Sequence, residues 1–348
     1  MNEAFREIIA ASDVDRRDLF VGTATRLGTT VQNVEKDFWV CWVLDALFNG
    51  LPAGGPRLLF KGGTSLSKGF GLISRFSEDI DITVFRGDLG QPVEPTDLEA
   101  LSGKQRRHRL DAIRNACRTF IQGDFHAGLH ACATRLVSQG FTLQSDFDDA
   151  DGQSLLFWYP TAMVRQGEYI RSAVKIESGA KSALDPHTMA IIKPYVADDL
   201  PHLDLRVMNV TTVQPERTFW DKVVILHGIR QWFEQRAELR HGGQRVSRHY
   251  YDVHQLLSSP EASKWIGNIE LAEDCARHAR LFFGSPDLRL DIARHGTFTL
   301  MPSAGMLDAL RRDYTAMTGM IFHEVPSLAD VLASVERLEA TINARSDT

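Results

Sequence analysis

Residues 61–85 constrain the fold of this chain more than any other stretch. A glycine pair, Gly62 and Gly63, follows a short apolar run and precedes a group of hydroxyl residues. After a spacer, Asp79 and Asp81 alternate with isoleucines. Because side chains on a strand alternate between its two faces, both aspartates point to one side while the isoleucines point into a core. The stretch therefore predicts a strand, a turn with a short helix, and a second strand that carries two carboxylates.

The two aspartates suit a site for divalent metal ions. At a rise of ~3.3 Å per residue, the Cβ atoms of Asp79 and Asp81 would lie roughly 7 Å apart. Both carboxylates can then converge on Mg²⁺, whose oxygen ligands lie at about 2.1 Å. The spacing also suits a pair of ions about 3.5–4 Å apart. We expect Mg²⁺, with Mn²⁺ as the alternative.

The glycine pair and the hydroxyl residues suit a bound phosphate. Gly62 and Gly63 let the backbone approach a phosphate closely and adopt a positive φ. The hydroxyl residues can cap the following helix and donate to phosphate oxygens; they are Thr64, Ser65 and Ser67. A glycine turn alone is usually only a turn, and a lone Asp-x-Asp is usually a solvated strand edge. Together, in this order, they predict a site for a nucleoside triphosphate and its metal ions.

Length and composition predict a two-lobed protein without a membrane segment. At 348 residues the chain exceeds the usual size of one compact domain, and we expect lobes at 1–185 and 186–348. No apolar run approaches the ~20 residues that span a bilayer, and the N-terminus lacks a signal-peptide pattern. The four cysteines show no Cys-x-x-Cys pairing, which predicts reduced thiols and a cytoplasmic location.

The charged residues are unevenly distributed. A formal net charge of −6 argues against a protein that coats nucleic acids non-specifically. One basic stretch contains only Asp111 as an acid and comprises Lys104, Arg106, Arg107, Arg109, Arg114 and Arg118. A second comprises Arg236, Arg240, Arg245 and Arg248. Local basic patches on an acidic protein suit a substrate that is gripped at one place, and a solvated helix face is the alternative.

The order of predicted elements indicates the fold class. Helices are expected over the first 50 residues and from 104 to 138, with strands at 58–61, 79–85, 141–147, 154–161 and 172–178. From about 182 onward helices dominate, starting at Pro215 and continuing at 248–258, 270–282, 305–320 and 327–343. We therefore predict an α/β catalytic lobe with a small mixed sheet, a mostly helical C-terminal lobe, and a site in the cleft between them.

The segment from Phe60 to Asp81 resembles a known signature. Its strings Lys-Gly-Gly-Thr-Ser-Leu-Ser-Lys and Arg-Phe-Ser-Glu-Asp-Ile-Asp resemble the Gly-Gly/Ser…Asp-x-Asp signature of the DNA polymerase β-like nucleotidyltransferase superfamily. Within that superfamily they are similar to the AbiEii/AbiGii toxin family. The resemblance extends to residues 34–40, 215–222, 248–252 and 313–322, and so covers nearly the whole chain.

The resemblance implies both a fold and an activity. The family supplies the toxic half of bacterial toxin–antitoxin and phage-defence pairs, and it includes the MenT tRNA nucleotidyltransferases. A polymerase β-like fold is implied, with Mg²⁺-dependent transfer of a nucleoside monophosphate from a nucleoside triphosphate to an acceptor hydroxyl and release of pyrophosphate. A tRNA 3′ end is the implied acceptor, and a cognate antitoxin the implied partner. A protein or small-molecule acceptor, or a nucleotide-binding regulator without turnover, are the alternatives.

A polymerase-type site needs a third carboxylate on a neighbouring strand, and Glu177 offers one. Lys175 shares its face and could hold a phosphate oxygen or pair with an aspartate. The family more often has aspartate at the position of Glu177. Because glutamate is longer, whether Glu177 binds the metal directly is left open. A surface Lys–Glu pair is the alternative.

Three residues of the helical lobe complete the prediction. Lys222, on the helix that begins at Pro215, can reach a β- or γ-phosphate, unless it is a solvated helix lysine. Arg248 and Asp252 are four residues apart and share a helical face. Arg248 could contact phosphate and Asp252 could place the lysines or the nucleophile, with an intrahelical salt bridge as the alternative. No Walker A loop, Gly-x-Ser-x-Gly elbow or zinc-ligand spacing competes with this prediction.

Overall fold

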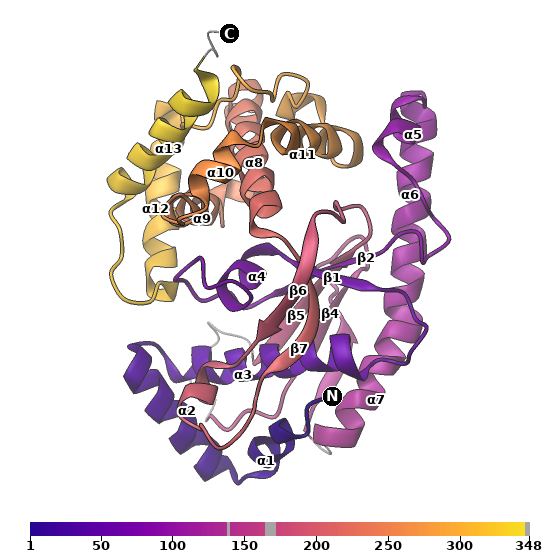
Figure 1. The fold of residues 1–348 in the computed structure, drawn as a ribbon, viewed down its shortest axis with the longest axis vertical. Coiled ribbons are helices and arrows are strands. Elements are labelled where there is room, and N and C mark those ends of the chain that lie inside the picture. The colour runs from indigo at the N-terminus through magenta and orange to yellow at the C-terminus, as the bar shows by residue number, and fades with distance from the viewer. Residues whose placement is uncertain (138–139, 164–171, 345–348) are drawn as a thin grey trace. The chain divides into compact units, whose positions relative to one another are not determined.

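A computed structural model describes residues 1–137, 140–163 and 172–344 of the chain (Figure 1). The chain forms two compact units. Unit 1 comprises Met1–Phe70, Phe76–Val93 and Leu101–Val213, and unit 2 comprises Gly71–Arg75, Glu94–Ala100 and Gln214–Thr348. Two short segments of the N-terminal part therefore belong to the unit that otherwise contains the C-terminal part.

Unit 1 is built on a seven-stranded sheet with the strand order β3-β4-β5-β2-β1-β7-β6. The strands are β1 (Leu58–Lys61), β2 (Ile80–Val84), β3 (Thr142–Ser145), β4 (Ser154–Trp158), β5 (Ala173–Gly179), β6 (His187–Ile192) and β7 (Val207–Val213). The pairs β2–β5 and β1–β7 are parallel, and the other neighbours are antiparallel. This mixed sheet, together with the flanking helices, confirms the predicted fold class.

The helices of unit 1 are α1 (Ala4–Ala10), α2 (Asp13–Leu27), α3 (Val31–Asp45), α4 (Gly62–Lys68), α6 (Gly103–Phe120) and α7 (His126–Val137). Helices α3, α4 and α6 contact strands of the sheet, whereas α2 packs on α3 and α1 packs on α7. Thr30 caps α3 by accepting a hydrogen bond from Asn33, as its position predicts. Trp39 and Trp42 of α3 contact the ring of Phe157 in β4, with centroids 6.0 and 5.1 Å apart. Figure 1 shows α2 beside α3.

The predicted alternation along β2 is present. Ile80 and Ile82 are fully buried, whereas Asp81 between them is half-buried. The strand begins at Ile80, so Asp79 lies immediately before it rather than on it. The apolar side of this strand therefore belongs to the core, and its polar side carries the carboxylate.

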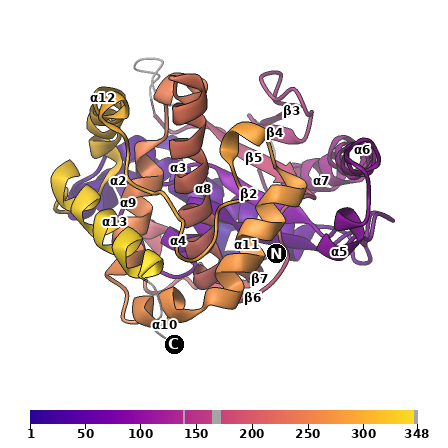
Figure 2. The ribbon, with the colours of Figure 1, turned by 90° about the horizontal axis from the view of Figure 1, so that it is seen from above.

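Unit 2 is mainly helical, as Figure 2 shows from above. Its helices are α5 (Pro95–Glu99), α8 (Pro215–Arg236), α9 (Ser247–Leu257), α10 (Ala262–Gly267), α11 (Ile269–Phe282), α12 (Leu307–Met317) and α13 (Leu328–Asn343). Pro215 occupies the first turn of α8, where its missing N–H costs nothing. Trp220 of α8 is buried and donates its indole N–H to the main-chain oxygen of Trp265 at 2.9 Å.

Strands β6 and β7 were missed by the sequence analysis, which expected helices from about residue 182. Both belong to the sheet of unit 1, beyond the predicted lobe boundary at 185. Phe60 of β1 lies opposite Thr212 of β7. Such a parallel pairing of distant segments leaves little local signal in the sequence. Within the part of the chain that the structure describes, no helix is both long and apolar enough to cross a membrane.

Candidate active site

Four polar residues lie side by side on neighbouring strands of unit 1. Asp81 of β2 is opposite Lys61 of β1 on one side and opposite Glu177 of β5 on the other. Glu177 is in turn opposite Ser154 of β4. Residues paired across a ladder project to the same face, and neighbouring strands are ~4.8 Å apart. Asp81 and Glu177 therefore present two carboxyl groups next to each other on one face of the sheet.

Gly62 leaves the space that the carboxylate of Asp81 occupies. Its φ is 80°, a left-handed conformation that residues with a side chain rarely adopt. A Cβ atom at this position would lie 2.1 Å from Oδ2 of Asp81. On the other carboxylate oxygen, Lys61 Nζ lies 3.9 Å from Oδ1. Gly62 has the positive φ that the sequence analysis allowed for and lets the main chain approach a carboxylate closely, whereas its approach to a phosphate stays a prediction.

The hydroxyl groups of Thr64 and Ser65 are used inside the fold. Thr64 Oγ1 donates to the main-chain oxygen of Asp79 at 2.5 Å and lies 2.8 Å from the hydroxyl of Ser77. Ser65 Oγ donates to the main-chain oxygen of Gly62 at 2.9 Å. Both residues are fully buried. The bonds of Thr64 tie α4 to the segment that precedes β2, whereas the bond of Ser65 lies within α4, so both hydroxyls already have partners inside the fold. Ser67, the third predicted hydroxyl, is half-buried and hydrogen-bonds the side chain of Tyr195.

An ion-pair network holds Glu177 on the same face. Lys175 Nζ lies 2.8 Å from Oε1 of Glu177 and 3.1 Å from Oδ2 of Asp146. Burial works against the ammonium group, but the two carboxylates outweigh it and raise the pKa of Lys175. The Lys–Glu pair that the sequence analysis held as the alternative is therefore present, and Lys175 also pairs with an aspartate. Asp146, which is only 6% exposed, was not predicted, because it belongs to an acidic loop without a recognisable pattern.

The oxygen donors in this row fit a hard divalent cation bound together with a nucleotide. Carboxylates such as those of Asp79 and Asp81 are the ligands that Mg²⁺ takes. Over residues 1–137, 140–163 and 172–344, no three His, Cys, Asp or Glu side chains converge on one ion position. Mg²⁺ at nucleotide sites is usually held by one or two carboxylates and by phosphate oxygens, not by a cage made only of protein. The Asp81 carboxylate beside Gly62, with Asp79 two residues earlier in the chain, fits that pattern.

Unit 2 contains a different arrangement, in which one carboxylate is buried between two cations. Asp252 of α9 is fully buried. It accepts hydrogen bonds from Nε and Nη2 of Arg75 at 2.7 and 2.9 Å. Lys222 of α8 lies 2.8 Å from Oδ2 of Asp252. Charge-assisted, bidentate contacts of this kind fix the orientation of both partners. Asp252 therefore holds Lys222 in place, whereas its role in catalysis stays a prediction.

This cluster carries more positive than negative charge. Burial disfavours the Asp252 carboxylate, but Arg75 and Lys222 outweigh burial and hold its pKa well below the usual range. Burial lowers the pKa of Lys222, with Asp252 opposing and Arg75 adding to the effect. Burial and the neighbouring Lys222 and Arg248 also keep the pKa of His249 well below its ordinary value. An excess of fixed cations is the environment that a phosphate group favours.

Arg75 reaches this cluster on a short excursion of the chain. Residues 71–75 lie between α4 and β2 in the sequence but belong to unit 2. The main-chain N–H of Phe322 donates to the oxygen of Ser74 at 2.8 Å, and Arg75 forms an antiparallel bridge with Ile321. The sequence analysis gave Arg75 no role, because its partner Asp252 lies 177 residues later in the chain.

The first predicted basic patch lies on α6. Arg109 donates to the main-chain oxygen of Pro92 at 2.7 Å, and Arg114 lies 3.0 Å from Asp111. Other cations of the patch are exposed; these are Lys104, Arg107 and Arg118. The patch is therefore a partly neutralised helix face that keeps several cations on its surface.

In the second patch, Arg236 pairs with Asp287 at 2.6 Å. The side chain of Arg240 lies outside the described residues.

The mixed sheet, the helix that begins at Gly62 and the pair of Asp79 and Asp81 at the start of β2 are the features that the sequence analysis expected of a nucleotidyltransferase. The fold of this chain is similar to that of the nucleotidyltransferase toxin MenT4 from Mycobacterium tuberculosis H37Rv. The TM-score is 0.50 at 15% sequence identity, and the match covers 95% of this chain and 90% of that chain.

The model of the family described as nucleotidyl transferase AbiEii toxin, type IV TA system, matches residues 45–341. The chain belongs to the AbiEii family and is a nucleotidyltransferase toxin of a type IV toxin–antitoxin system. No curated protein matches it in a sequence comparison. The predicted family and enzyme class are confirmed.

Proposed function

We propose that this protein transfers a nucleoside monophosphate from a nucleoside triphosphate to the 3′ end of a tRNA, with Mg²⁺ as its metal and Mn²⁺ as an alternative. The observation that carries this proposal is the direct register of Asp81 with Glu177, beside a glycine that leaves room for the Asp81 carboxylate. Adjacent carboxylates at an open main-chain segment are what a triphosphate and its cations require.

Each residue of unit 1 then has a defined role. Asp79 and Asp81 hold the metal, which when bound neutralises charge on the triphosphate and polarises the reacting phosphate. Gly62 and Gly63 place main-chain N–H groups on the phosphates. The buried hydroxyl of Thr64 supports this segment by holding α4 against the chain that precedes β2, and that of Ser65 bonds the main-chain oxygen of Gly62 within α4.

In the proposed reaction the oxygen of the acceptor hydroxyl attacks the α-phosphorus in line. The bond between that phosphorus and the bridging oxygen breaks, and pyrophosphate leaves with the electron pair. Glu177 takes the proton of the hydroxyl and is oriented by Lys175, 2.8 Å away. Lys222 and Arg248 balance the charge of the phosphates, and Asp252 fixes Lys222.

The acceptor and partners follow from the surface charge and the family resemblance. Exposed cations on α6 suit the phosphate backbone of an RNA on a protein whose net charge is −6. Modification of tRNA 3′ ends would block aminoacylation and arrest growth. A cognate antitoxin would control that arrest, and a response to phage infection is the setting that the resemblance implies.

The test uses each of the four nucleoside triphosphates labelled at the α-phosphate, with total cell RNA and protein as acceptors. We expect label in a small-RNA band that RNase removes, with loss of labelling when EDTA is added and when Asp81→Asn replaces the wild-type protein. Label that survives RNase would assign a protein or small-molecule acceptor instead. Nucleotide binding without pyrophosphate release would overturn the catalytic proposal.

A further inference from the structure

Three consecutive charged residues lie in the middle of the buried helix α3. Glu35, Lys36 and Asp37 are 2%, 3% and 2% exposed. Charged side chains are almost never buried to this extent unless they are paired. Consecutive residues of a helix point about 100° apart, so the three side chains reach three different segments of unit 1. The partners of each side chain identify the segments of unit 1 that α3 fixes in position.

Asp37 holds the end of α4. Its Oδ1 lies 2.5 Å from Nζ of Lys68, the last residue of α4. Its Oδ2 accepts the main-chain N–H of Tyr195 at 2.7 Å, and the Lys68 ammonium lies 3.5 Å from the centre of the Tyr195 ring. Burial disfavours the charged lysine, but Asp37 outweighs burial and raises the pKa of Lys68. The helix that begins at Gly62 is thus fixed at its far end by a buried ion pair.

Lys36 holds the segment that leads into the aspartates. Its Nζ lies 2.6 Å from Oε2 of Glu78, and the lysine side chain is 4% exposed against 25% for the glutamate. Glu78 is the residue before Asp79. The position of the main chain at Asp79 is therefore fixed by Lys36 from one side and by the hydroxyl of Thr64 from another.

Two adjacent residues of one helix thus hold both ends of the stretch 69–77, which separates α4 from the aspartates. The two pairs have opposite polarity, because Lys36 binds an acid whereas Asp37 binds a base. An exchange of partners would place Lys36 against Lys68 and Asp37 against Glu78, and like charges in a buried environment repel. The charge pattern therefore specifies which end of the stretch lies where.

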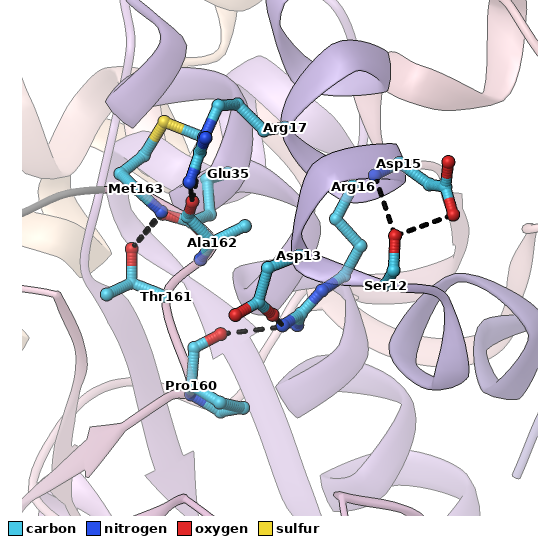
Figure 3. Close-up of polar contacts among 10 residues, drawn as sticks. All are labelled: Ser12, Asp13, Asp15, Arg16, Arg17, Glu35, Pro160, Thr161, Ala162 and Met163. Atoms are coloured by element: carbon cyan, nitrogen blue, oxygen red, sulfur yellow. Dashed lines mark hydrogen bonds and ion pairs between the residues drawn. The ribbon is translucent and has the colours of Figure 1, made fainter.

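Glu35 provides a comparison within the same helix, shown in Figure 3. It accepts the hydroxyl of Thr161 at 2.7 Å and the main-chain N–H of Ala162 at 2.6 Å. The same short segment is held by Arg16 and Arg17 of α2, which donate to the main-chain oxygens of Pro160 and Ala162. Glu35 is as buried as its neighbours, yet its hydrogen-bond partners Thr161 and Ala162 follow β4 in the chain and belong neither to α4 nor to the segment that leads into the aspartates.

We propose that Lys36 and Asp37 are positioning residues for nucleotidyl transfer, fixing the helix from Gly62 and the aspartates in one geometry. The inference rests on the proposed function of that site. Neither residue touches the reacting atoms. Their effect is on the relative position of α4 and Asp79, and a displacement of ~1 Å in such groups can reduce a rate by about 10²-fold.

The first experiment compares Lys36→Met with Glu35→Gln in the full-length protein. Both variants remove one buried charge from α3 with little change of volume, and both should lower the thermal midpoint. Pyrophosphate release at saturating nucleoside triphosphate should fall on the order of 10²-fold in Lys36→Met, and stay within about threefold of wild type in Glu35→Gln. The KM for the triphosphate should change little in either. Equal kcat values in the two variants would overturn the proposal.

A charge exchange provides the second experiment. Lys36→Glu and Glu78→Lys should each reduce kcat, because each places like charges together. The kcat of the double variant should be at least tenfold higher than that of the less active single variant. A double variant that has the circular dichroism of the native protein but a kcat no higher than that of the single variants would contradict the proposal. If the double variant does not fold, the comparison of Lys36→Met with Glu35→Gln tests the proposal by itself. Wild-type protein without transfer to any acceptor would instead contradict the proposed function, which separates the two failures.

Discussion

The carboxylates of the two units differ in how accessible they are. In unit 1 the side chains of Asp81 and Glu177 are 26% and 38% exposed, so an incoming ligand can reach them. In unit 2 the side chain of Asp252 is 0% exposed and lies between Arg75 and Lys222. The same functional group, a carboxylate, is thus accessible to a ligand in unit 1 and fixes neighbouring side chains in unit 2. Burial and the number of fixed partners distinguish the two uses.

The largest effect that tests this contrast is on stability. Asp252→Asn removes the carboxylate that Arg75 and Lys222 share, and loss of one member of a buried ion pair typically costs about 3–5 kcal/mol. Asp81→Asn is the control, because a half-buried carboxylate near the surface should change stability by no more than about 0.5 kcal/mol. Urea unfolding followed by circular dichroism measures both. Equal destabilisation by the two substitutions would show that the two carboxylates do not differ in this way.

Gly62→Ala sharpens the comparison on the side of unit 1. The new Cβ would collide with Oδ2 of Asp81, and a positive φ adds strain of about 1–3 kcal/mol. We expect pyrophosphate release to fall on the order of 10²-fold, because the carboxylate must move. Gly90→Ala is the matched control, since Gly90 also has a positive φ (71°) but a Cβ there would meet no neighbouring atom within 4 Å. A similar loss of activity in both variants would assign the effect to strain alone.

A smaller, pH-dependent effect follows from the lowered pKa of Asp252. A carboxyl group whose pKa is lower in the folded state stabilises the fold fully above its unfolded pKa of about 3.9. This stabilisation is lost as the pH falls through the folded-state pKa. The difference in unfolding free energy between wild type and Asp252→Asn should therefore be constant from about pH 7 to pH 5 and shrink below about pH 4. A difference that grows on acidification would exclude this ion-pair account.

The sequence predicted what depends on local pattern. The alternation at Asp79–Val84 indicated a half-buried strand, which is present from Ile80, and Gly62 indicated a position of positive φ, which is also present. Partners distant in the sequence could not be predicted. The register of Asp81 with Glu177 depends on the pairing of two separate strands, and a hydroxyl such as that of Thr64 suits a phosphate or a main-chain oxygen equally well. Sequence thus indicated which residues are polar and close to the site, but not which of them are already engaged.

The excursion of residues 71–75 has a consequence for biosynthesis. Ribosomes make the chain from its N-terminus, and segments fold as they emerge. Arg75 is made early, but the Asp252 that pairs with it follows 177 residues later, and the Phe322 that donates to Ser74 follows later still. The nascent chain therefore carries its aspartates long before the support of Arg75 exists. A toxin made in this order cannot complete its cationic cluster until Lys222 and Asp252 have been synthesised.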